Sequence, residues 1–234
     1  GTGGLDGLDQ LLGVAPGIPV VVLSGADDER LGLAAVRRGA QDYATKCERD
    51  AAPLWRTINR AIERAHVTRE LIRRANQDSL TGLPNRALFV QRVDQAIARS
   101  RRWATGFTVI FVEVDDFKSI NDNFGHATGD DVLREISRRF LSGLGDGDTP
   151  CRYAGVAFAA ICHAADRADA TRVARRVQES ICREPVVSGV RSFKIGVSIG
   201  VALGAGDDHA ETLMHRVDGA IYEAKLTGAV CVVD

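Results

Sequence analysis

Residues 111–133 read FVEVDDFKSINDNFGHATGDDVL, the most informative segment of the chain. It opens as an apolar strand that ends in carboxylates, and it then takes on a helical pattern. Residues two apart on a strand share a face, so Glu113 and Asp115 are expected to point the same way where the strand ends. Carboxylates at such a strand end suit a hard cation such as Mg²⁺, which prefers oxygen ligands and bridges substrate phosphates.

Three polar residues in the helical part of this stretch suit a nucleotide. Lys118 can offset phosphate charge. Asn121 both donates and accepts hydrogen bonds and Asp130 accepts two, so together they could read the edge of a guanine. Gly125 and Gly129 let the chain turn tightly around such a ligand. Taken singly, each of these residues is better explained as a helix cap or a solvated charge.

Strand and helix patterns alternate around this stretch from Asp78 to the end of the chain, over the length of one domain. Two short strands flank a tight, uncharged turn at residues 154–157 within CRYAGVAFAAI, 151–161. Further strands are predicted at 107–114, 193–203 and 229–234, and helices at 168–186 and 210–228. Interleaved elements of this kind predict an α/β or α+β sandwich.

The first fifty residues have a different pattern. The run IPVVVL at 18–23 reads as a strand buried on both faces, and hence as parallel. A helix is predicted over 27–40, with arginines in its last turn and Gly39 at its end, followed by a short strand over 42–46. The local pattern alone also fits a generic βαβ unit.

A heptad follows Pro53. Seven apolar or small residues are spaced alternately by four and three: Leu54, Ile58, Ala61, Ala65, Thr68, Ile72 and Ala75. The alternative is one amphipathic helix packed on its own domain. A parallel dimeric stalk is preferred, because the seam extends past what a small α/β domain needs to cover itself.

The composition narrows the class of protein. The chain has 234 residues, 45% hydrophobic and 26% charged, with a formal net charge of −1. This balance gives no reason to expect nucleic acid or an anionic membrane as the main partner. The five scattered cysteines favour a reducing cytoplasm over a disulfide framework or zinc site. No apolar run suits a membrane span and no signal peptide opens the chain, whose abrupt start predicts a fragment of a longer protein.

Four motifs together resemble GGDEF domains, the diguanylate cyclases of bacterial cyclic-di-GMP signalling. They are DSLTGLPNR (78–86), DDFKSINDNFGHATGDDVL (115–133), VSIGVAL (197–203) and DGAIYEAK (218–225). The resemblance covers residues 78–234. It implies a nucleotidyl-cyclase-like, palm-type α/β sandwich around a central, mainly antiparallel sheet. It also implies GTP as ligand with Mg²⁺ as its cofactor, and nucleotide-binding roles for Asn121, Asp130, Lys118 and Lys225.

The signature of this family is altered here. Where the family has R-x-G-G-D/E-E-F, this chain has RYAGVAF, so the five signature positions are Ala154, Gly155, Val156, Ala157 and Phe158. The resemblance assigns a metal-binding carboxylate to the third position and an essential glutamate to the fourth. Val156 and Ala157 have no side-chain oxygen, so the sequence predicts a degenerate domain without catalytic residues.

Other family positions are altered as well. The second metal ligand, an Asp helped by the next backbone carbonyl, corresponds to Glu113 and Val114. Glutamate is one methylene longer, and a misplacement of about 1 Å can cost roughly 10²-fold in rate. A second phosphate contact, an Arg in the family, falls on Ala229. In the inhibitory product site, R-x-x-D, Asp148 is kept but Gly145 replaces the Arg, which argues against feedback binding of cyclic-di-GMP.

Residues 16–46 are similar to the C-terminal half of a flavodoxin-like response-regulator receiver. The resemblance implies switch roles for Ser24 and Tyr43 and a phosphate-contacting role for Lys46. The phosphoacceptor aspartate would precede Gly1. The predicted domains are therefore a truncated receiver (1–52), a helical stalk (53–77) and a degenerate GGDEF domain (78–234).

Three functions remain open. The first is a regulatory, non-catalytic receiver–GGDEF protein that binds GTP and forms a homodimer through its stalk. The second is an active diguanylate cyclase with an unusual metal arrangement, using Glu113 and Asp115. The third is a structural spacer ahead of an EAL-type phosphodiesterase domain. A sensor kinase and the EAL domain are the partners expected in the full-length protein.

Overall fold

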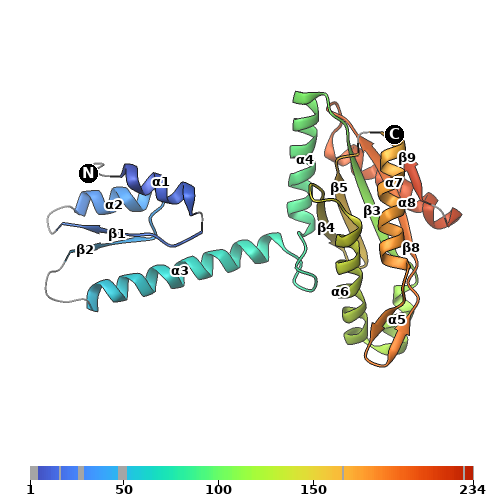
Figure 1. The fold of residues 1–234 in the computed structure, drawn as a ribbon, viewed down its shortest axis with the longest axis horizontal. Helices are drawn as coiled ribbons and strands as arrows, with labels where there is room; N and C mark the ends of the chain where they lie inside the picture. Colours follow the sequence, from blue (N-terminus) through green and yellow to red (C-terminus); the bar gives the residue numbers. More distant parts are fainter. Residues whose placement is uncertain are drawn as a thin grey trace. The chain divides into compact units, whose positions relative to one another are not determined.

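A computed structural model describes residues 5–15, 17–25, 29–46, 52–164, 166–228 and 230–233. The chain divides into two compact units, Gly1–Ala75 and Asn76–Asp234. Figure 1 follows it from the first unit, in blue, to the end of the second, in red. None of the helices in the described residues combines the length and the apolar character needed to cross a membrane.

The described part of the first unit contains two strands and three helices. They are α1 (Asp6–Val14), β1 (Val21–Ser24), α2 (Glu29–Arg37), β2 (Asp42–Thr45) and α3 (Ala52–Asn76). The two strands are parallel, with Val21 opposite Asp42 and Ser24 opposite Thr45. The order strand, helix, parallel strand is the one that the sequence predicts.

The expectation that the first strand is buried on both faces is wrong. Val22 packs against the cluster that includes Leu8 and Ala35. Leu23, which points to the opposite face, is 46% exposed. Successive residues of a strand face opposite sides, and an apolar run does not by itself show that both sides are covered.

The two halves of α3 have different surroundings. In the first half Ala61 is fully buried, and Arg64 donates to the Asp42 carboxylate at 2.5 Å beside β2. In the second half Leu71 and Ile72 are 61% and 56% exposed. The predicted seam is therefore covered at Ala61 and exposed at Ile72. Pairing of two copies through this helix stays a prediction.

The second unit is built on a five-stranded sheet of order β4-β5-β3-β8-β9. Its strands are β3 (Phe107–Val114), β4 (Thr149–Ala154), β5 (Ala157–Cys162), β8 (Val197–Gly204) and β9 (Cys231–Val233). β3 is antiparallel to β5 and β8, β4 is antiparallel to β5, and β9 is parallel to β8. The predicted central, mainly antiparallel sheet is confirmed.

Helices cover both faces of this sheet (Figure 1). They are α4 (Arg86–Trp103), α6 (His126–Gly143), α7 (Arg167–Cys182) and α8 (Ala210–Thr227), while the short α5 (Phe117–Phe124) packs against α6. Along β3, Ile110 and Val112 join the core shared with α6 and α7. Val109 and Phe111 join the core shared with α4 and α8. Because β3 is buried on both faces, its apolar residues do not alternate with polar ones.

The single strand predicted over residues 193–203 is two strands. β7 (Arg191–Phe193) pairs with β6 (Val186–Ser188) in a hairpin of its own, and β8 begins only at Val197. Between them Gly196 passes close to Asp115, where an added Cβ would lie 3.1 Å from a carboxylate oxygen. The apolar pattern continues through this break, and for this reason the sequence predicts one continuous strand.

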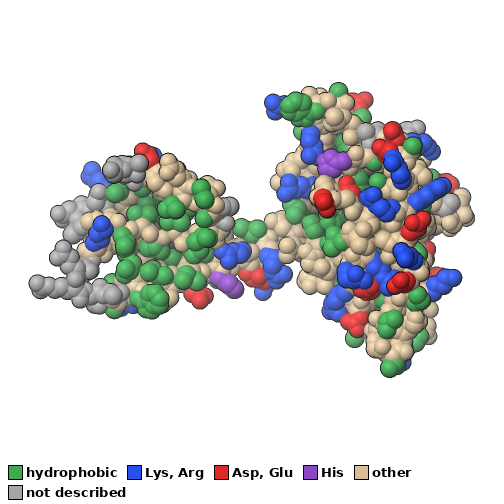
Figure 2. All heavy atoms as spheres, viewed as in Figure 1, with side chains coloured by type: hydrophobic (Ala, Val, Ile, Leu, Met, Phe, Trp, Pro, Cys, Tyr) green, Lys and Arg blue, Asp and Glu red, His purple; other side chains and the backbone are tan. Residues whose placement is uncertain are grey.

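Several arginines of α6 pair along their own helix. Arg138 and Arg139 both donate to Glu135, at 2.7 and 2.8 Å. Hydrogen bonds from Arg138, together with those from Arg139 and against the opposing effect of burial, lower the pKa of Glu135 to about 2. Figure 2 shows basic and acidic side chains interspersed over α6 and α7. This pattern is typical of a solvent-exposed surface on which neighbouring charged side chains form ion pairs.

Candidate functional site

The candidate site lies where β3 ends, beside the turn between β4 and β5. Glu113 near the end of β3 lies opposite Ala157 of β5 on one side and Ser198 of β8 on the other. α5 begins shortly after β3, at Phe117. The signature turn, the acidic strand end and the start of α5 are therefore neighbours at one edge of the sheet.

Glu113 and Lys225 form an ion pair at this edge. Lys225 Nζ on α8 donates to Glu113 Oε1 at 2.7 Å, and the two side chains are 44% and 31% exposed. The sequence predicts Glu113 as a metal ligand and Lys225 as a phosphate contact. In the structure each side chain offsets the charge of the other, so a ligand would have to compete with an existing contact.

The signature positions form the tip of the β4–β5 hairpin. Gly155 adopts a φ of +45°, and the Arg152 guanidinium donates twice to its carbonyl, at 3.1 and 2.7 Å. Val156 is partly buried and packs against the domain core, while Ala157 faces Glu113 across the β3–β5 ladder. At these two positions the hairpin presents only apolar groups to the site.

Asp115 has a partner of its own. The Ser198 hydroxyl donates to Asp115 Oδ1 at 2.8 Å, whereas the neighbouring carboxylate of Glu113 accepts from Lys225. The two carboxylates at the strand end thus have different partners. Within the residues that the structure describes, no three His, Cys, Asp or Glu side chains gather into a cluster that could hold a metal ion.

The predicted guanine readers lie on two consecutive helices joined at Gly125, whose φ of +81° favours glycine. Gly129 on α6 lies against Asn121, and an added Cβ there would overlap Asn121 Oδ1. That oxygen is buried and has no hydrogen-bond partner among the described residues. Asp130, next to Gly129, is half-buried, and Lys118 on α5 is exposed. The turn thus places Gly129, the neighbour of Asp130, against the Asn121 side chain.

The motif DSLTGLPNR is tied to the signature hairpin. Arg152 donates to Asp78 Oδ1 at 2.9 Å, and its backbone N–H donates to the Pro84 carbonyl at 2.9 Å. Burial acts to raise the pKa of Asp78, but hydrogen bonds from Thr81 and Arg152 outweigh it and hold that pKa below its ordinary value. The sequence did not predict the pairing of Asp78 with Arg152, because the two residues are 74 positions apart and belong to separate motifs.

Replacing Arg152 by Met is expected to destabilise the second unit by about 2 to 3 kcal/mol, because it leaves a partly buried carboxylate without its cation. The side chains of Arg152 and Asp78 are only 11% and 23% exposed. The free energy of unfolding in urea measures the effect. Arg92→Met, at an exposed arginine that donates to Gln95 in its own helix, is the matched control and should change little. Equal losses in the two variants would contradict the role assigned to Arg152.

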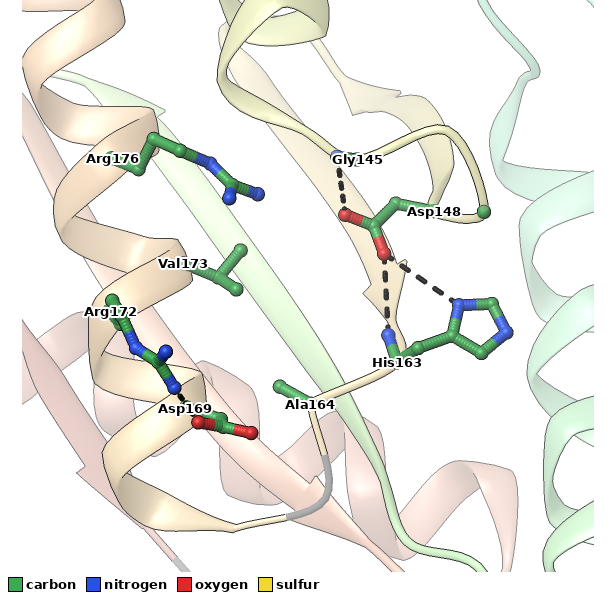
Figure 3. A pocket seen from close by; sticks show the side chains of 9 residues that line it. Gly145, Asp148, His163, Ala164, Asp169, Arg172, Val173 and Arg176 are labelled. Atoms are coloured by element: carbon green, nitrogen blue, oxygen red, sulfur yellow. Dashed lines mark hydrogen bonds and ion pairs between the residues drawn. The ribbon is translucent and has the colours of Figure 1, made fainter.

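A pocket of about 500 Å³ lies between the loop after α6 and helix α7 (Figure 3). On one side Asp148 accepts the backbone N–H of Gly145 at 2.8 Å and of His163 at 3.3 Å. On the other side Arg172 and Arg176 of α7 are engaged in contacts within the domain. Gly145 thus meets Asp148 through its backbone, where the family's product site has an arginine side chain. Loss of feedback binding stays a prediction.

Of the predicted receiver residues, Ser24 and Lys46 lie at the carboxyl ends of the two parallel strands, and Tyr43 lies near the start of β2. Ser24 ends β1, and Lys46, which follows β2, donates its backbone N–H to the Ser24 carbonyl at 2.8 Å. The Ser24 hydroxyl is buried and has no hydrogen-bond partner in the described part of the chain. Tyr43 lies against Gly32 of α2, where an added Cβ would overlap its ring. Ala229, the altered phosphate position, lies outside the described residues.

The sheet order, the helices on both faces and the turn that carries Asn121 and Asp130 define a nucleotidyl-cyclase-like domain. The family model described as "Diguanylate cyclase, GGDEF domain" matches residues 75–230. The chain belongs to the GGDEF family of cyclic-di-GMP signalling.

Two curated proteins and one solved structure illustrate the similarity. "Response regulator PleD" of Caulobacter vibrioides is 33% identical over 226 residues, 92% of this chain and 50% of PleD. "Bifunctional diguanylate cyclase/cyclic di-GMP phosphodiesterase MucR" of Pseudomonas aeruginosa is 37% identical over 174 residues, 74% of this chain and 25% of MucR. This chain thus spans half or less of their length.

The solved structure is that of the coiled coil and GGDEF domain of DgcB from Caulobacter crescentus, in complex with c-di-GMP. It superposes with a TM-score of 0.70 and 25% identity, covering 78% of this chain and 97% of that one.

Proposed function

We propose that this chain is a non-catalytic GGDEF module that binds GTP through its guanine base and transmits a regulatory state. The proposal rests on the difference between the catalytic positions of the site and its base-reading positions. At the catalytic side, Val156 and Ala157 carry no oxygen and Glu113 is paired with Lys225. At the base-reading side, Asn121 keeps a buried acceptor without a partner among the described residues.

This unused acceptor suits guanine. The base presents N–H donors beside a carbonyl acceptor on one edge, and Asn121 Oδ1 and the Asp130 carboxylate can accept from those donors. A buried acceptor without a partner has lost its hydrogen bond to water, so a ligand that supplies a donor recovers that cost. Adenine presents an acceptor where guanine has N1–H. A site with a carboxylate at this place should therefore reject ATP.

The residues present do not fit Mg²⁺ in the arrangement that two-metal phosphoryl transfer requires. Two signature positions lack side-chain oxygens, and Glu113 Oε1 already accepts from Lys225 at 2.7 Å. No catalytic step through Mg²⁺ follows from these residues. The ion would reach this protein with the phosphates of GTP, whose charge the exposed Lys118 can offset.

The proposed input is a partial receiver in which Ser24, Tyr43 and Lys46 act as switch residues. Two findings support it: the backbone contact that joins Ser24 to Lys46, and the alignment of 92% of this chain with PleD, a protein named as a response regulator. In the full-length protein, placed by this proposal in the bacterial cytoplasm, a sensor kinase would supply the signal. The exposed second half of α3 would join two copies, and DgcB, solved with its coiled coil, supports this stalk.

Calorimetric titration of GTP into the purified protein with Mg²⁺, with ATP as control, tests the proposal. Micromolar, GTP-selective binding is expected, together with no cyclic-di-GMP when the incubated mixture is analysed by mass spectrometry. Formation of cyclic-di-GMP from GTP would contradict the non-catalytic part and favour an active cyclase. Absence of heat with GTP would contradict the ligand.

A second candidate is a structural spacer attached to an EAL-type phosphodiesterase domain. The observation that favours it is the 37% identity with MucR, a protein named as both cyclase and phosphodiesterase, of which this chain matches only 25%. In that case neither GTP nor ATP should give a binding heat. The GTP titration therefore separates the two candidates.

A further inference from the structure

The β6–β7 hairpin, which the sequence did not predict, lies next to the turn that carries the guanine readers. Its strands pair Val186 with Phe193 and Ser188 with Arg191, and Gly189 between them adopts a φ of +60°. In Figure 1 it is the orange hairpin at the bottom of the second unit, beside α5. Its side chains reach two points of the α5–α6 turn.

The first point is Phe124, the last residue of α5. The Phe193 ring packs edge-on against it, with ring centroids 5.2 Å apart and planes inclined by 74°. The Arg191 guanidinium carbon lies 4.7 Å from the centre of the same Phe124 ring. Contacts of both kinds are attractive, and a ring held by two neighbours has little freedom to shift. Phe124 is three residues from Asn121.

The second point is Asp131, the neighbour of Asp130 on α6. The Ser188 hydroxyl donates to Asp131 Oδ2 at 3.0 Å, while Arg134 donates to the other oxygen, Oδ1, at 2.8 Å. Both carboxylate oxygens are therefore held, one by the hairpin and one by the helix itself. This fixes α6 at the residue next to the predicted guanine reader.

The base of the hairpin is anchored in the domain core. Val186 is fully buried and Phe193 is 9% exposed. The chain that leads into β6 is held by Arg139 of α6, which donates to the carbonyls of Glu184 and Pro185. Because the base of the hairpin is packed into the core, the hairpin can hold the residues that it contacts in a fixed position.

We propose that this hairpin is a positioning element of the nucleotide pocket, in which Ser188 and Arg191 hold the α5–α6 turn and thereby set the place of Asn121 and Asp130. The inference rests on the proposed function and deepens it, since it assigns residues outside the family motifs to guanine selectivity. Neither side chain needs to touch the nucleotide. Binding groups must be held within fractions of an ångström to discriminate ligands, so loss of their supports weakens recognition.

The test uses the full chain with both supports removed, Ser188→Ala with Arg191→Ala. The dissociation constant for GTP is expected to rise about tenfold, with a smaller GTP-to-ATP preference. Amide hydrogen exchange should quicken in residues 117–131 and stay unchanged elsewhere in the second unit. The conservative pair Ser188→Thr with Arg191→Lys keeps a hydroxyl and a cation, and should restore most of the affinity. Val190→Ser, at a fully exposed residue of the same hairpin, should change nothing.

Unchanged exchange and unchanged GTP affinity in the double alanine variant would overturn the inference. Faster exchange throughout the second unit would overturn it too, because the hairpin would then act only on overall stability. If the wild-type protein binds no GTP, the proposed function fails on that result alone. The exchange comparison still decides the inference in that case: faster exchange confined to the turn supports it, and unchanged exchange rejects it.

Discussion

Gly129→Ala is expected to weaken GTP binding at least about 100-fold while the protein stays folded. Gly129 is buried within α6 and has a helical backbone, which alanine adopts readily. The added Cβ would, however, overlap Asn121 Oδ1 and lie 3.1 Å from the Phe117 ring. The Asn121 side chain is the easiest of these groups to move. The helix is therefore expected to persist while the Asn121 amide, the proposed guanine reader, leaves its place.

Calorimetric titration with GTP and circular dichroism of the same sample measure the two halves of this prediction. Gly219→Ala is the matched control, since Gly219 is exposed on α8 and an added Cβ would meet nothing within 4 Å. That change should stabilise the protein by about 0.5 to 1 kcal/mol through helix propensity and leave GTP binding as it was. Full GTP affinity in Gly129→Ala would show that Asn121 is not part of the pocket.

The proposed function separates base recognition from catalysis, and the residues assigned to the two roles lie on different elements. The signature positions Val156 and Ala157 belong to a hairpin held by Arg152 and Asp78. Asn121 and Asp130 belong to the α5–α6 turn. Replacing carboxylates on the hairpin by small apolar residues leaves the backbone of that turn untouched. The loss of catalysis that we propose therefore does not require any change in the residues proposed to bind the base.

The parts of the fold that the sequence predicts well are those with strong local patterns. The apolar run at 107–114 predicts strand β3, and Gly228, whose φ is +69°, marks the end of α8. Both features can be recognised from neighbouring residues alone. The heptad predicts α3 as a helix, but it does not tell whether Ala61 faces a second copy or its own unit. A period of 3.5 records only that one face is apolar.

The contacts that shape the site are not visible in the sequence, because they join distant residues. Lys225 and Glu113 are 112 positions apart, and the sequence predicts a separate role for each, a phosphate contact and a metal ligand. The partner of Asp115, Ser198, is 83 positions away. The β6–β7 hairpin was missed because Phe193 continues the apolar pattern of β8 without any turn residue other than Gly196.

Arg139→Met is expected to destabilise the second unit by about 3 to 5 kcal/mol, because it removes four hydrogen bonds from one charged and mostly buried donor. The Arg139 side chain is 11% exposed. Its guanidinium donates to Glu135 and to three backbone carbonyls where α7 ends and the chain enters β6: those of Ile181, Glu184 and Pro185. Helix ends leave carbonyls without intrahelical partners. Methionine fills a similar volume but donates to none of them, so the carbonyl of the buried Ile181 is left without its donor, and those of Glu184 and Pro185 lose a charged partner.

The free energy of unfolding in urea, followed by circular dichroism, checks this value. Arg138→Met supplies the comparison, because Arg138 is the adjacent residue and shares Glu135 at 2.7 Å. Its side chain is 71% exposed, and the change should have little effect, as is usual for solvated ion pairs. If the two variants lose equal stability, the pairs with Glu135 dominate. A much larger loss at Arg139 instead assigns the stability to the carbonyls that it gathers at the junction of α7 and the hairpin.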